Sequence, residues 1–217
     1  KTIILGPNPL VATKYDNKIE HKRLFQYLNL PRNEVKIFKN LSELKRIDEK
    51  FFPFFVSASF SSGGQEADII LSKKDLEKFF PRLRANNRND KFLVAKLIKN
   101  IVLAPNTSVI VTGKKQTEII CVSDQIMHGK RYLGNIYPSK ISKKNRRIIT
   151  DSTVKIGNYL AHKGFRGLFG CDFLIDSKDN CYITDLNPRR QGGYFCNVLT
   201  LLQKGINLIE TELKLAL

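Results

Sequence analysis

The spacing of apolar residues along the chain changes repeatedly between the periods of helices and strands. Helical spacing over 17–28 predicts a first helix, which Pro31 ends. Apolar or alternating runs predict strands at 35–38, 51–57, 67–71, 92–98, 109–112, 118–122, 169–175 and 181–186. Further helices are predicted from 41 onward, at 73–80 after a Ser72 cap, at 152–162 and at 205–217. The 217 residues therefore form one large or two small units of mixed helix and strand.

The composition is that of a folded protein. Hydrophobic residues make up 42% and aromatic residues 10% of the chain, which is enough for a core and excludes a fibre or a disordered tail. No apolar run approaches the roughly 18 to 20 residues of a membrane span, and residues 1–6 lack a signal-peptide pattern. We expect a soluble, cytoplasmic protein without a membrane partner. Because residue 1 is Lys rather than Met, we also expect a preceding segment to have been removed or left out.

Basic residues exceed acidic ones by 37 to 20, a formal net charge of +17. Such an excess fits nucleic acid, an anionic membrane surface or a phosphate-rich ligand. The densest basic run, 140–147 (KISKKNRR), contains no aromatic residue that could stack on bases, which favours a solvated loop or a helix start. The cysteines have the irregular spacing of buried free thiols rather than of a zinc site: Cys121, Cys171, Cys181 and Cys196.

Two acidic residues lie in the apolar strands of the C-terminal hairpin. Alternation places Asp185 and Asn187 on one face, and the hairpin can bring Asp172 alongside. Two carboxylates and an amide oxygen form an all-oxygen set suited to Mg²⁺. Pairing of each acid with a neighbouring arginine, Arg189 or Arg190, is the alternative, and the pattern does not decide between the two.

A loop rich in serine and glycine follows the strand at 51–57. Its residues Ser61, Ser62, Gly63 and Gly64 offer backbone N–H groups and hydroxyls that could cover a polyphosphate. The Walker A pattern is absent, since Gln65 and Glu66 follow the second glycine. Taken alone, the loop is better explained as a plain hairpin turn.

In this order, the loop and the acidic hairpin resemble the ATP-grasp carboxylate–amine ligases. The similarity covers nearly the whole chain: DNK at 16–18, FFVSASFSSGG at 54–64, LVAKLI at 93–98, GCDF at 170–173 and DLNPR at 185–189. The resemblance implies that Lys18 contacts ATP phosphate and that the loop at 61–64 covers the phosphates. It also implies that the backbone of Lys96, Leu97 and Ile98 reads the adenine edge.

The resemblance also implies roles at the reacting end of the nucleotide. Asp172, Asp185 and Asn187 would hold Mg²⁺, with Mn²⁺ as the alternative ion, and Arg189 would steady the acyl phosphate or tetrahedral intermediate. Segments 132–138 and 164–167 are similar to the peptide-ligase-like branch. Arg166 there would face a substrate carboxylate or phosphate, unless it is a surface charge at a helix C-terminus.

The sequence departs from the family pattern at two positions. Ser57 stands where the family usually has a lysine for the α- and β-phosphates, so Lys18, Lys96 or another cation would have to replace it. Asp185 stands where Glu is commoner, which keeps a metal-competent carboxylate on a shorter side chain.

The expected fold is therefore α+β, an ATP-grasp fold whose two subdomains hold the nucleotide between them. We expect an N-terminal adjunct at 1–45, a small lobe at 46–95 and a large lobe at 96–217. The expected activity is an ATP- and Mg²⁺-dependent ligase that activates a small-molecule acid as acyl phosphate and joins it to an amine. A missing N-terminal domain or a homodimer would complete it. The alternatives are a nucleotide-binding pseudoenzyme or regulatory domain and, less favoured, a basic nucleic-acid-binding domain.

Overall fold

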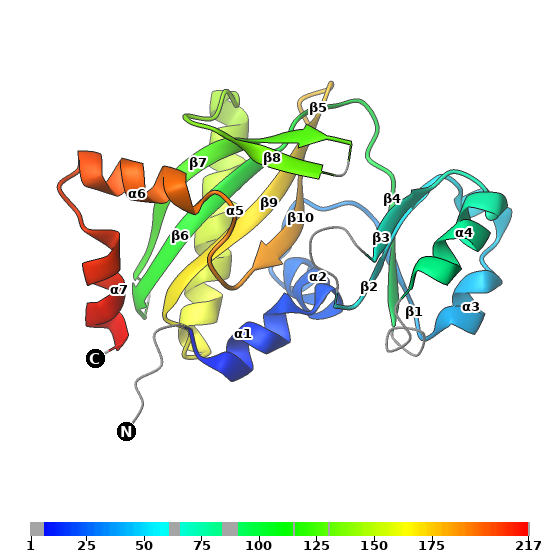
Figure 1. Cartoon of the computed structure of the whole chain (residues 1–217), viewed down its shortest axis with the longest axis horizontal. Helices are drawn as coiled ribbons and strands as arrows, with labels where there is room; N and C mark the ends of the chain where they lie inside the picture. Colours follow the sequence, from blue (N-terminus) through cyan, green and yellow to red (C-terminus); the bar gives the residue numbers. More distant parts are fainter. Residues whose placement is uncertain (1–6, 61–65, 84–90, 115, 130, 217) are drawn as a thin grey trace.

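Two β-sheets form two lobes that lie side by side along the long axis of the molecule (Figure 1). The computed structural model describes residues 7–60, 66–83, 91–114, 116–129 and 131–216. The loop predicted to cover phosphates, Ser61 to Gly64, lies outside the described residues. Within the described residues, no helix is both long enough and apolar enough to cross a bilayer.

The small lobe is a four-stranded antiparallel sheet covered on one face by two helices. Its strands follow the order β1 (Val35–Phe38), β4 (Phe92–Lys96), β2 (Phe54–Ala58) and β3 (Ala67–Ile70). The helices α3 (Leu41–Lys45) and α4 (Lys73–Phe79) are capped by the side chains of Asn40 and Ser72, and the 3-10 turns Glu49–Phe51 and Phe80–Arg82 flank them. Alternate residues of β2 (Phe54, Val56 and Ala58) pack in the core under these helices, which directs Ser57 to the opposite face.

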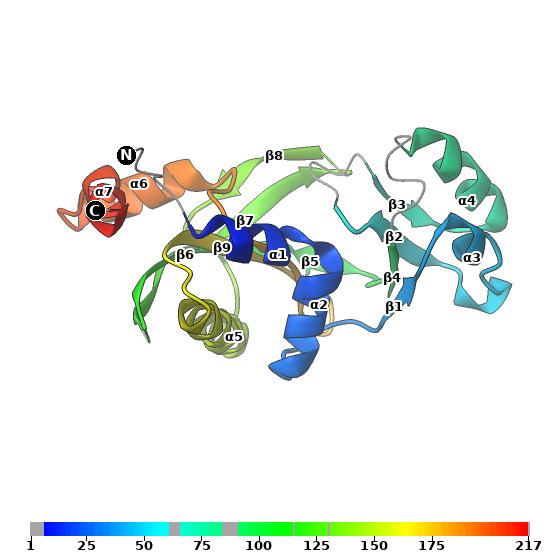
Figure 2. The same cartoon turned by 90° about the horizontal axis from the view of Figure 1, so that it is seen from below.

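The large lobe is a six-stranded antiparallel sheet with helices on both faces. Its strands follow the order β10 (Cys181–Asn187), β9 (Gly167–Asp176), β6 (Pro105–Gly113), β7 (Gln116–His128) and β8 (Arg131–Ile136), with the short β5 (Ile101–Leu103) paired to β9. The helices α1 (Pro9–Asp16), α2 (Lys18–Tyr27) and α5 (Lys143–His162) pack on one face (Figure 2). The helices α6 (Tyr194–Gln203) and α7 (Leu208–Ala216) supply Leu201 and Leu208 to a smaller core on the other face.

The chain crosses between the lobes twice, and the two crossings are bonded to each other. The segment 31–34 leads from α2 into β1, and the segment 97–100 leads from β4 into β5. Lys96 N–H donates to the Glu34 carbonyl at 2.9 Å, and Asn33 Nδ2 donates to the Lys96 carbonyl at 2.9 Å. The lobes are therefore joined by a double-stranded hinge.

The lobe boundary differs from the one expected from the sequence. The small sheet begins at Val35 rather than near residue 46, because β1 pairs with β4 over Val35–Ala95 to Phe38–Phe92. Leu44 of α3 is likewise buried in the small-lobe core. The remainder of the expected N-terminal adjunct, α1 and α2, packs against β10 of the large lobe. Pairing between segments more than 50 residues apart leaves no local signal in the sequence.

Because α2 contributes to the large-lobe core, truncating its buried aromatic residue should destabilise the whole lobe. Phe25 is fully buried there. We expect Phe25→Ala to lower the free energy of unfolding, measured by urea denaturation, by about 3 to 5 kcal/mol. Gln26→Ala, at the next and exposed position of α2, is the control and should change it by less than about 0.5 kcal/mol. Equal effects of the two variants would mean that α2 is only loosely attached.

Candidate active site

Two acidic residues face each other at the edge of the large sheet. Asp172 of β9 and Asp185 of β10 are directly paired across the ladder, after a register shift between Ile183 and Asp185. Asn187, two residues further along β10, donates from Nδ2 to Asp172 Oδ2 at 3.0 Å. The hairpin thus brings together the three residues that the sequence nominated as oxygen donors.

Asp172 is surrounded by amides rather than by cations. Its Oδ1 accepts from Asn106 Nδ2 and from Gln125 Nε2, both at 2.7 Å. Asn106 Nδ2 also donates to Gln191 Oε1 at 3.0 Å. Burial, together with the charge of Asp185, raises the pKa of Asp172 to about 6, although the amide hydrogen bonds oppose the rise.

Asp185 is surrounded by basic groups, all from α2. Lys18 Nζ donates to Asp185 Oδ2 at 2.8 Å, and His21 Nε2 lies 3.4 Å from Oδ1, an electrostatic contact rather than a hydrogen bond. Lys22 Nζ donates to the carbonyl of Thr184. Burial alone would raise the pKa of Asp185, but the charge and hydrogen bond of Lys18, together with the other basic groups of α2, outweigh it and hold this pKa well below its usual range.

The basic residues below Asp185 are themselves affected by burial. His21 is fully buried and stacks on Phe25 with ring centroids 5.2 Å apart. Burial lowers the pKa of His21 to about 3 and that of Lys22 to about 8, although Asp185 partly offsets both shifts. His21 is therefore neutral near pH 7, so Lys18 and Lys22 carry the charge that faces Asp185.

The two predicted arginines lie in different places. Arg189 is about half exposed; its Nη2 donates to Asn187 Oδ1 at 3.1 Å, and its Nε lies 3.6 Å from Asp16 Oδ1. It is therefore beside the carboxylate pair and accessible. Arg166 Nη1 donates to the carbonyls of Ala161 and Phe165 and so caps the C-terminal end of α5. A contact of Arg166 with substrate stays a prediction.

The predicted nucleotide contacts are distributed along the boundary between the lobes. Lys96, Leu97 and Ile98 lie at the hinge, where the backbone N–H and carbonyl of Lys96 bond to Glu34 and Asn33. The backbone N–H of Lys18 donates to the Ser59 carbonyl at 2.8 Å, so α2 reaches the end of β2 immediately before the predicted phosphate loop. Lys18 therefore lies beside both the end of β2 and the carboxylates.

Ser57 of β2 lies two residues before Ser59, on the face of the small sheet that is turned away from α3 and α4. It is fully buried, and its hydroxyl has no hydrogen-bond partner among the described residues. A buried hydroxyl without a partner costs about 1 to 3 kcal/mol. The hydroxyl is therefore an open donor and acceptor at the position where a lysine was expected.

The donor set is consistent with a hard divalent cation. Carboxylates and amide carbonyls suit Mg²⁺, which needs only one or two protein carboxylates when phosphates supply other ligands. Asn106 Oδ1 is buried and has no partner among the described residues, which leaves another oxygen near Asp172. In the described part of the chain, no group of three or more His, Cys, Asp or Glu residues is placed to hold a metal ion, so a metal here would depend on Asp172, Asp185 and amides.

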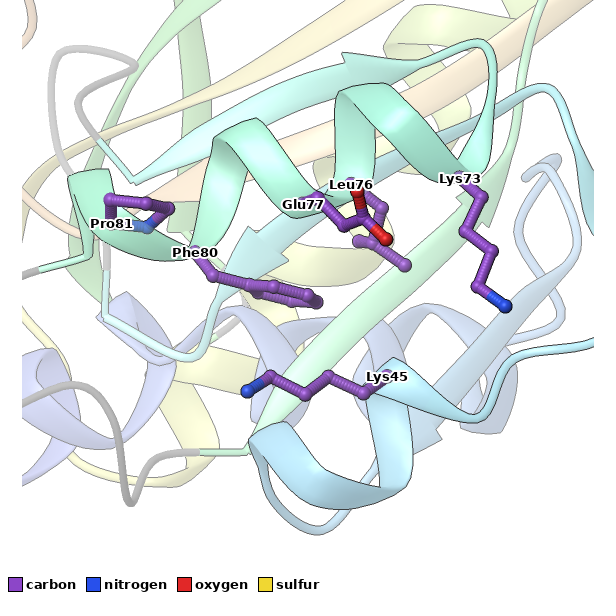
Figure 3. Close-up of a pocket in the computed structure, with 6 residues that line it drawn as sticks. All are labelled: Lys45, Lys73, Leu76, Glu77, Phe80 and Pro81. Carbon is purple, nitrogen blue, oxygen red and sulfur yellow. The ribbon is translucent and has the colours of Figure 1, made fainter.

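A surface pocket in the small lobe is distinct from this site. It encloses about 430 Å³ between α3 and α4 and is lined by Lys45, Lys73, Leu76, Glu77, Phe80 and Pro81 (Figure 3). Lys45 Nζ lies 5.2 Å from the centre of the Phe80 ring. Because α3 and α4 cover the face of the small sheet opposite Ser57, the pocket lies away from the carboxylate pair.

The two-lobed fold and this arrangement of residues can be compared with known proteins. The family model described as an ATP-grasp domain matches residues 21–193. This chain belongs to the ATP-grasp family. The match includes the small lobe, the hinge and both carboxylates, and it confirms the family and the fold expected from the sequence.

Solved structures show the same ATP-grasp fold. The biotin carboxylase domain of Hydrogenobacter thermophilus 2-oxoglutarate carboxylase, in complex with MgADP, ADP and bicarbonate, has a TM-score of 0.81 and 21% identity. Campylobacter jejuni biotin carboxylase has a TM-score of 0.83 and 19% identity. Each alignment covers 98% of this chain but 47% and 48% of the other, so this ATP-grasp chain spans about half their length. D-alanyl-alanine synthetase A of Vibrio cholerae has a TM-score of 0.77 and 14% identity over 97% of this chain and 66% of that one.

The sequence did not identify the groups that surround the carboxylates. Asn106, Gln125 and Gln191 come from three separate segments, and only the strand order brings them to Asp172. His21 and Lys22 did leave a signal, because with Lys18 they follow the i, i+3, i+4 spacing of one helix face. Buried basic residues in that spacing indicate an acidic partner elsewhere in the fold.

Burial of neutral His21 should make stability depend on pH. The unfolded chain protonates His21 near its ordinary pKa of 6.5, whereas the folded protein does so only near pH 3. In this window the unfolded state binds more protons, so falling pH should destabilise the protein by up to about 1.4 kcal/mol per pH unit. Urea denaturation from pH 7 to pH 4 should show the wild type losing stability relative to His21→Phe, which keeps the ring on Phe25. Parallel pH profiles would contradict a neutral, buried His21.

Proposed function

We propose that this chain is the nucleotide-binding and catalytic part of an ATP- and Mg²⁺-dependent carboxylate–amine ligase. One observation carries the proposal: Asp172 and Asp185 are paired, and Asn187 lies beside them. Lys18 binds Asp185 and reaches to the end of β2. Membership of the ATP-grasp family supports the proposal independently. Because the chain spans about half of its biotin carboxylase relatives, the acid and amine sites would be completed by another domain or by a second copy.

The proposed reaction has two steps. A carboxylate oxygen attacks the γ-phosphorus of ATP and the bond to the bridging oxygen breaks, which gives an acyl phosphate and ADP. An amine then attacks the acyl carbon, loses a proton and expels inorganic phosphate. Both steps develop negative charge on phosphate oxygens, so they require cations more than they require a general base.

The residues of the chain would divide this work between them. Asp172, Asp185 and Asn187 would hold Mg²⁺, which supplies charge neutralisation and orientation of the phosphates when bound. Lys18 would turn from Asp185 toward a phosphate oxygen once a cation neutralises the carboxylate. Arg189, exposed beside Asn187, would hold the acyl phosphate. The hinge backbone around Lys96 to Ile98 would receive the adenine.

A second candidate function is nucleotide binding without turnover, as in a regulatory domain. Ser57 favours it, because a hydroxyl replaces the positive charge that the family pattern has at this position. Loss of a charge next to the α- and β-phosphates would weaken transition-state stabilisation more than ground-state binding. Mg²⁺-dependent ATP binding, with no ADP release for any acid and amine tested, would select this candidate.

The ligase proposal predicts a specific loss on removing one carboxylate. We expect calorimetry to show Mg²⁺-dependent ATP binding by the wild type and at least about tenfold weaker binding by Asp185→Ala, with ADP release abolished. Asp185→Asn keeps the side-chain shape if the alanine variant unfolds. Asp151→Ala, an exposed carboxylate on α5, is the matched control and should bind as the wild type does. Unchanged ATP turnover in both Asp185 variants would refute the proposal.

Removing the Ser57 hydroxyl should change stability and binding in opposite directions. Ser57→Ala eliminates a buried polar group without a partner, so thermal unfolding should occur at an equal or higher temperature. If the hydroxyl donates to a phosphate, the same variant should bind ATP about 3- to 10-fold more weakly. Ser59→Ala, also buried but at the end of β2, is a comparison for general effects of the substitution. Unchanged affinity in Ser57→Ala would place the hydroxyl outside the nucleotide site.

A further inference from the structure

Helix α5 lies on the side of the large sheet that is also covered by α1 and α2 (Figure 2). Its outward face carries several basic residues. Lys143, Arg147, Asp151, Lys155 and Tyr159 follow at steps of four residues and form one ridge, here called the α5 ridge. Successive members are about 6 Å apart along the axis and the ridge is about 24 Å long. Lys143, Arg147 and Lys155 are exposed, and the Arg147 side chain is 87% exposed.

The ridge ends in a cluster of tyrosines from three helices. The Tyr159 ring lies 6.0 Å from that of Tyr15 and 5.9 Å from that of Tyr27, centre to centre. Tyr15 Oη donates to Tyr159 Oη at 3.1 Å, which fixes the cluster, while Tyr27 is 77% exposed. Lys14 and Lys163 each lie 5.5 Å from the centre of a ring in this cluster, those of Tyr15 and Tyr159.

The acidic groups on this surface leave the positive charge in excess. Asp151 lies 3.7 Å from Arg147, and Glu20 of α2 accepts from Arg23 at 2.7 Å. At the start of α5, Asp179 accepts from Lys144, Ser142 and Asn145. Lys143, Lys155, Lys14 and Lys163 have no acidic partner among the described contacts. The surface therefore combines several cations that lack an acidic partner among the described residues with an exposed aromatic ring.

We propose that the α5 ridge and Tyr27 form a binding surface for single-stranded nucleic acid. The ridge cations Lys143, Arg147 and Lys155 lie about 6 and 12 Å apart along the axis, which fits phosphates of an extended nucleic-acid strand, and the exposed Tyr27 at the end of the ridge offers a stacking platform for a base. An acidic protein would also match the charge, whereas every base of a nucleic-acid strand offers a flat face that can stack on the exposed ring. The basic run at 140–147 lacks aromatic residues in sequence, but the fold supplies them from α1, α2 and the far end of α5.

This surface is separate from the proposed nucleotide site. The side chains of Phe169, Cys171 and Phe173 in β9 point into the core beneath α5, whereas Asp172 between them points to the other face of the sheet. A strand bound on α5 and a nucleotide bound at the carboxylates would therefore occupy opposite faces. The two proposals can be tested, and can fail, independently.

The test is fluorescence anisotropy of a labelled oligouridine of about 12 nucleotides, titrated with the full chain at several salt concentrations. The first variant, Lys143→Gln with Lys155→Gln, removes two ridge cations. Its matched control, Lys73→Gln with Lys74→Gln, removes two exposed cations from α4, and both lower the net charge from +17 to +15. Tyr27→Ala tests stacking, and Asp151→Asn removes the only acidic member of the ridge.

The proposal expects salt-dependent binding in which the ridge variant loses at least about tenfold in affinity and reduces the slope of log K against log salt by about 1.4. The α4 control should match the wild type, Tyr27→Ala should bind about tenfold more weakly, and Asp151→Asn should bind more tightly. Saturating MgATP and the Asp185→Asn variant should leave the affinity unchanged.

Four outcomes would overturn the proposal. The first is no binding at low salt, and the second is equal loss in the ridge and α4 variants, which would mean attraction by net charge alone. The third is that polyglutamate binds as tightly as oligouridine and that Tyr27→Ala binds with the affinity of the wild type, which would indicate an acidic protein partner. The fourth is displacement of the oligouridine by MgATP, which would place the oligouridine in the nucleotide site.

Discussion

Two like charges side by side in a partly buried position are the constraint around which the large lobe is organised. Asp172 and Asp185 are direct ladder partners, so neither can be buried as a carboxylate without compensation. The protein compensates them in two ways: cations from α2 neutralise Asp185, and amides from β6, β7 and the segment after β10 hold Asp172. This asymmetry holds the pKa of Asp185 low and that of Asp172 high. It requires six segments to meet at one point: α2, β6, β7, β9, β10 and the segment after β10.

The helix α2 connects this constraint to the rest of the molecule. Asn17 caps its N-terminus, the backbone of Lys18 bonds to Ser59 of the small lobe, and its inner face delivers Phe25 to the large-lobe core. The hinge crossing at 31–34 then leaves the helix and bonds to the other crossing through Lys96. A change in charge at Asp185 therefore acts on the element that also positions the small lobe.

The sequence predicted those features whose signals are local. The turn at 176–180 and the alternation in β9 and β10 were sufficient to place Asp172, Asp185 and Asn187 together, and Ser72 marked the start of α4 correctly. Features that depend on distant pairing were not predicted: the membership of β1 in the small sheet, and the approach of Asn106, Gln125 and Gln191 to Asp172. The helix α5 begins at Lys143, nine residues before the predicted start, because its basic first turns do not show the apolar spacing on which the prediction relied.

The ion pair between Lys18 and Asp185 joins residues 167 positions apart in the chain, which matters for how the protein is made. At about 5 to 20 residues per second, a ribosome needs roughly 8 to 33 seconds to proceed from the first to the second. Throughout that interval α2 lacks β10, the strand against which it packs, although His21, Lys22 and Phe25 are buried in the folded protein. The small lobe, whose strands all lie between Val35 and Lys96, can fold meanwhile. The helices α1 and α2 are thus synthesised well before β10, the strand against which they pack, and their apolar faces stay without that partner until it is made.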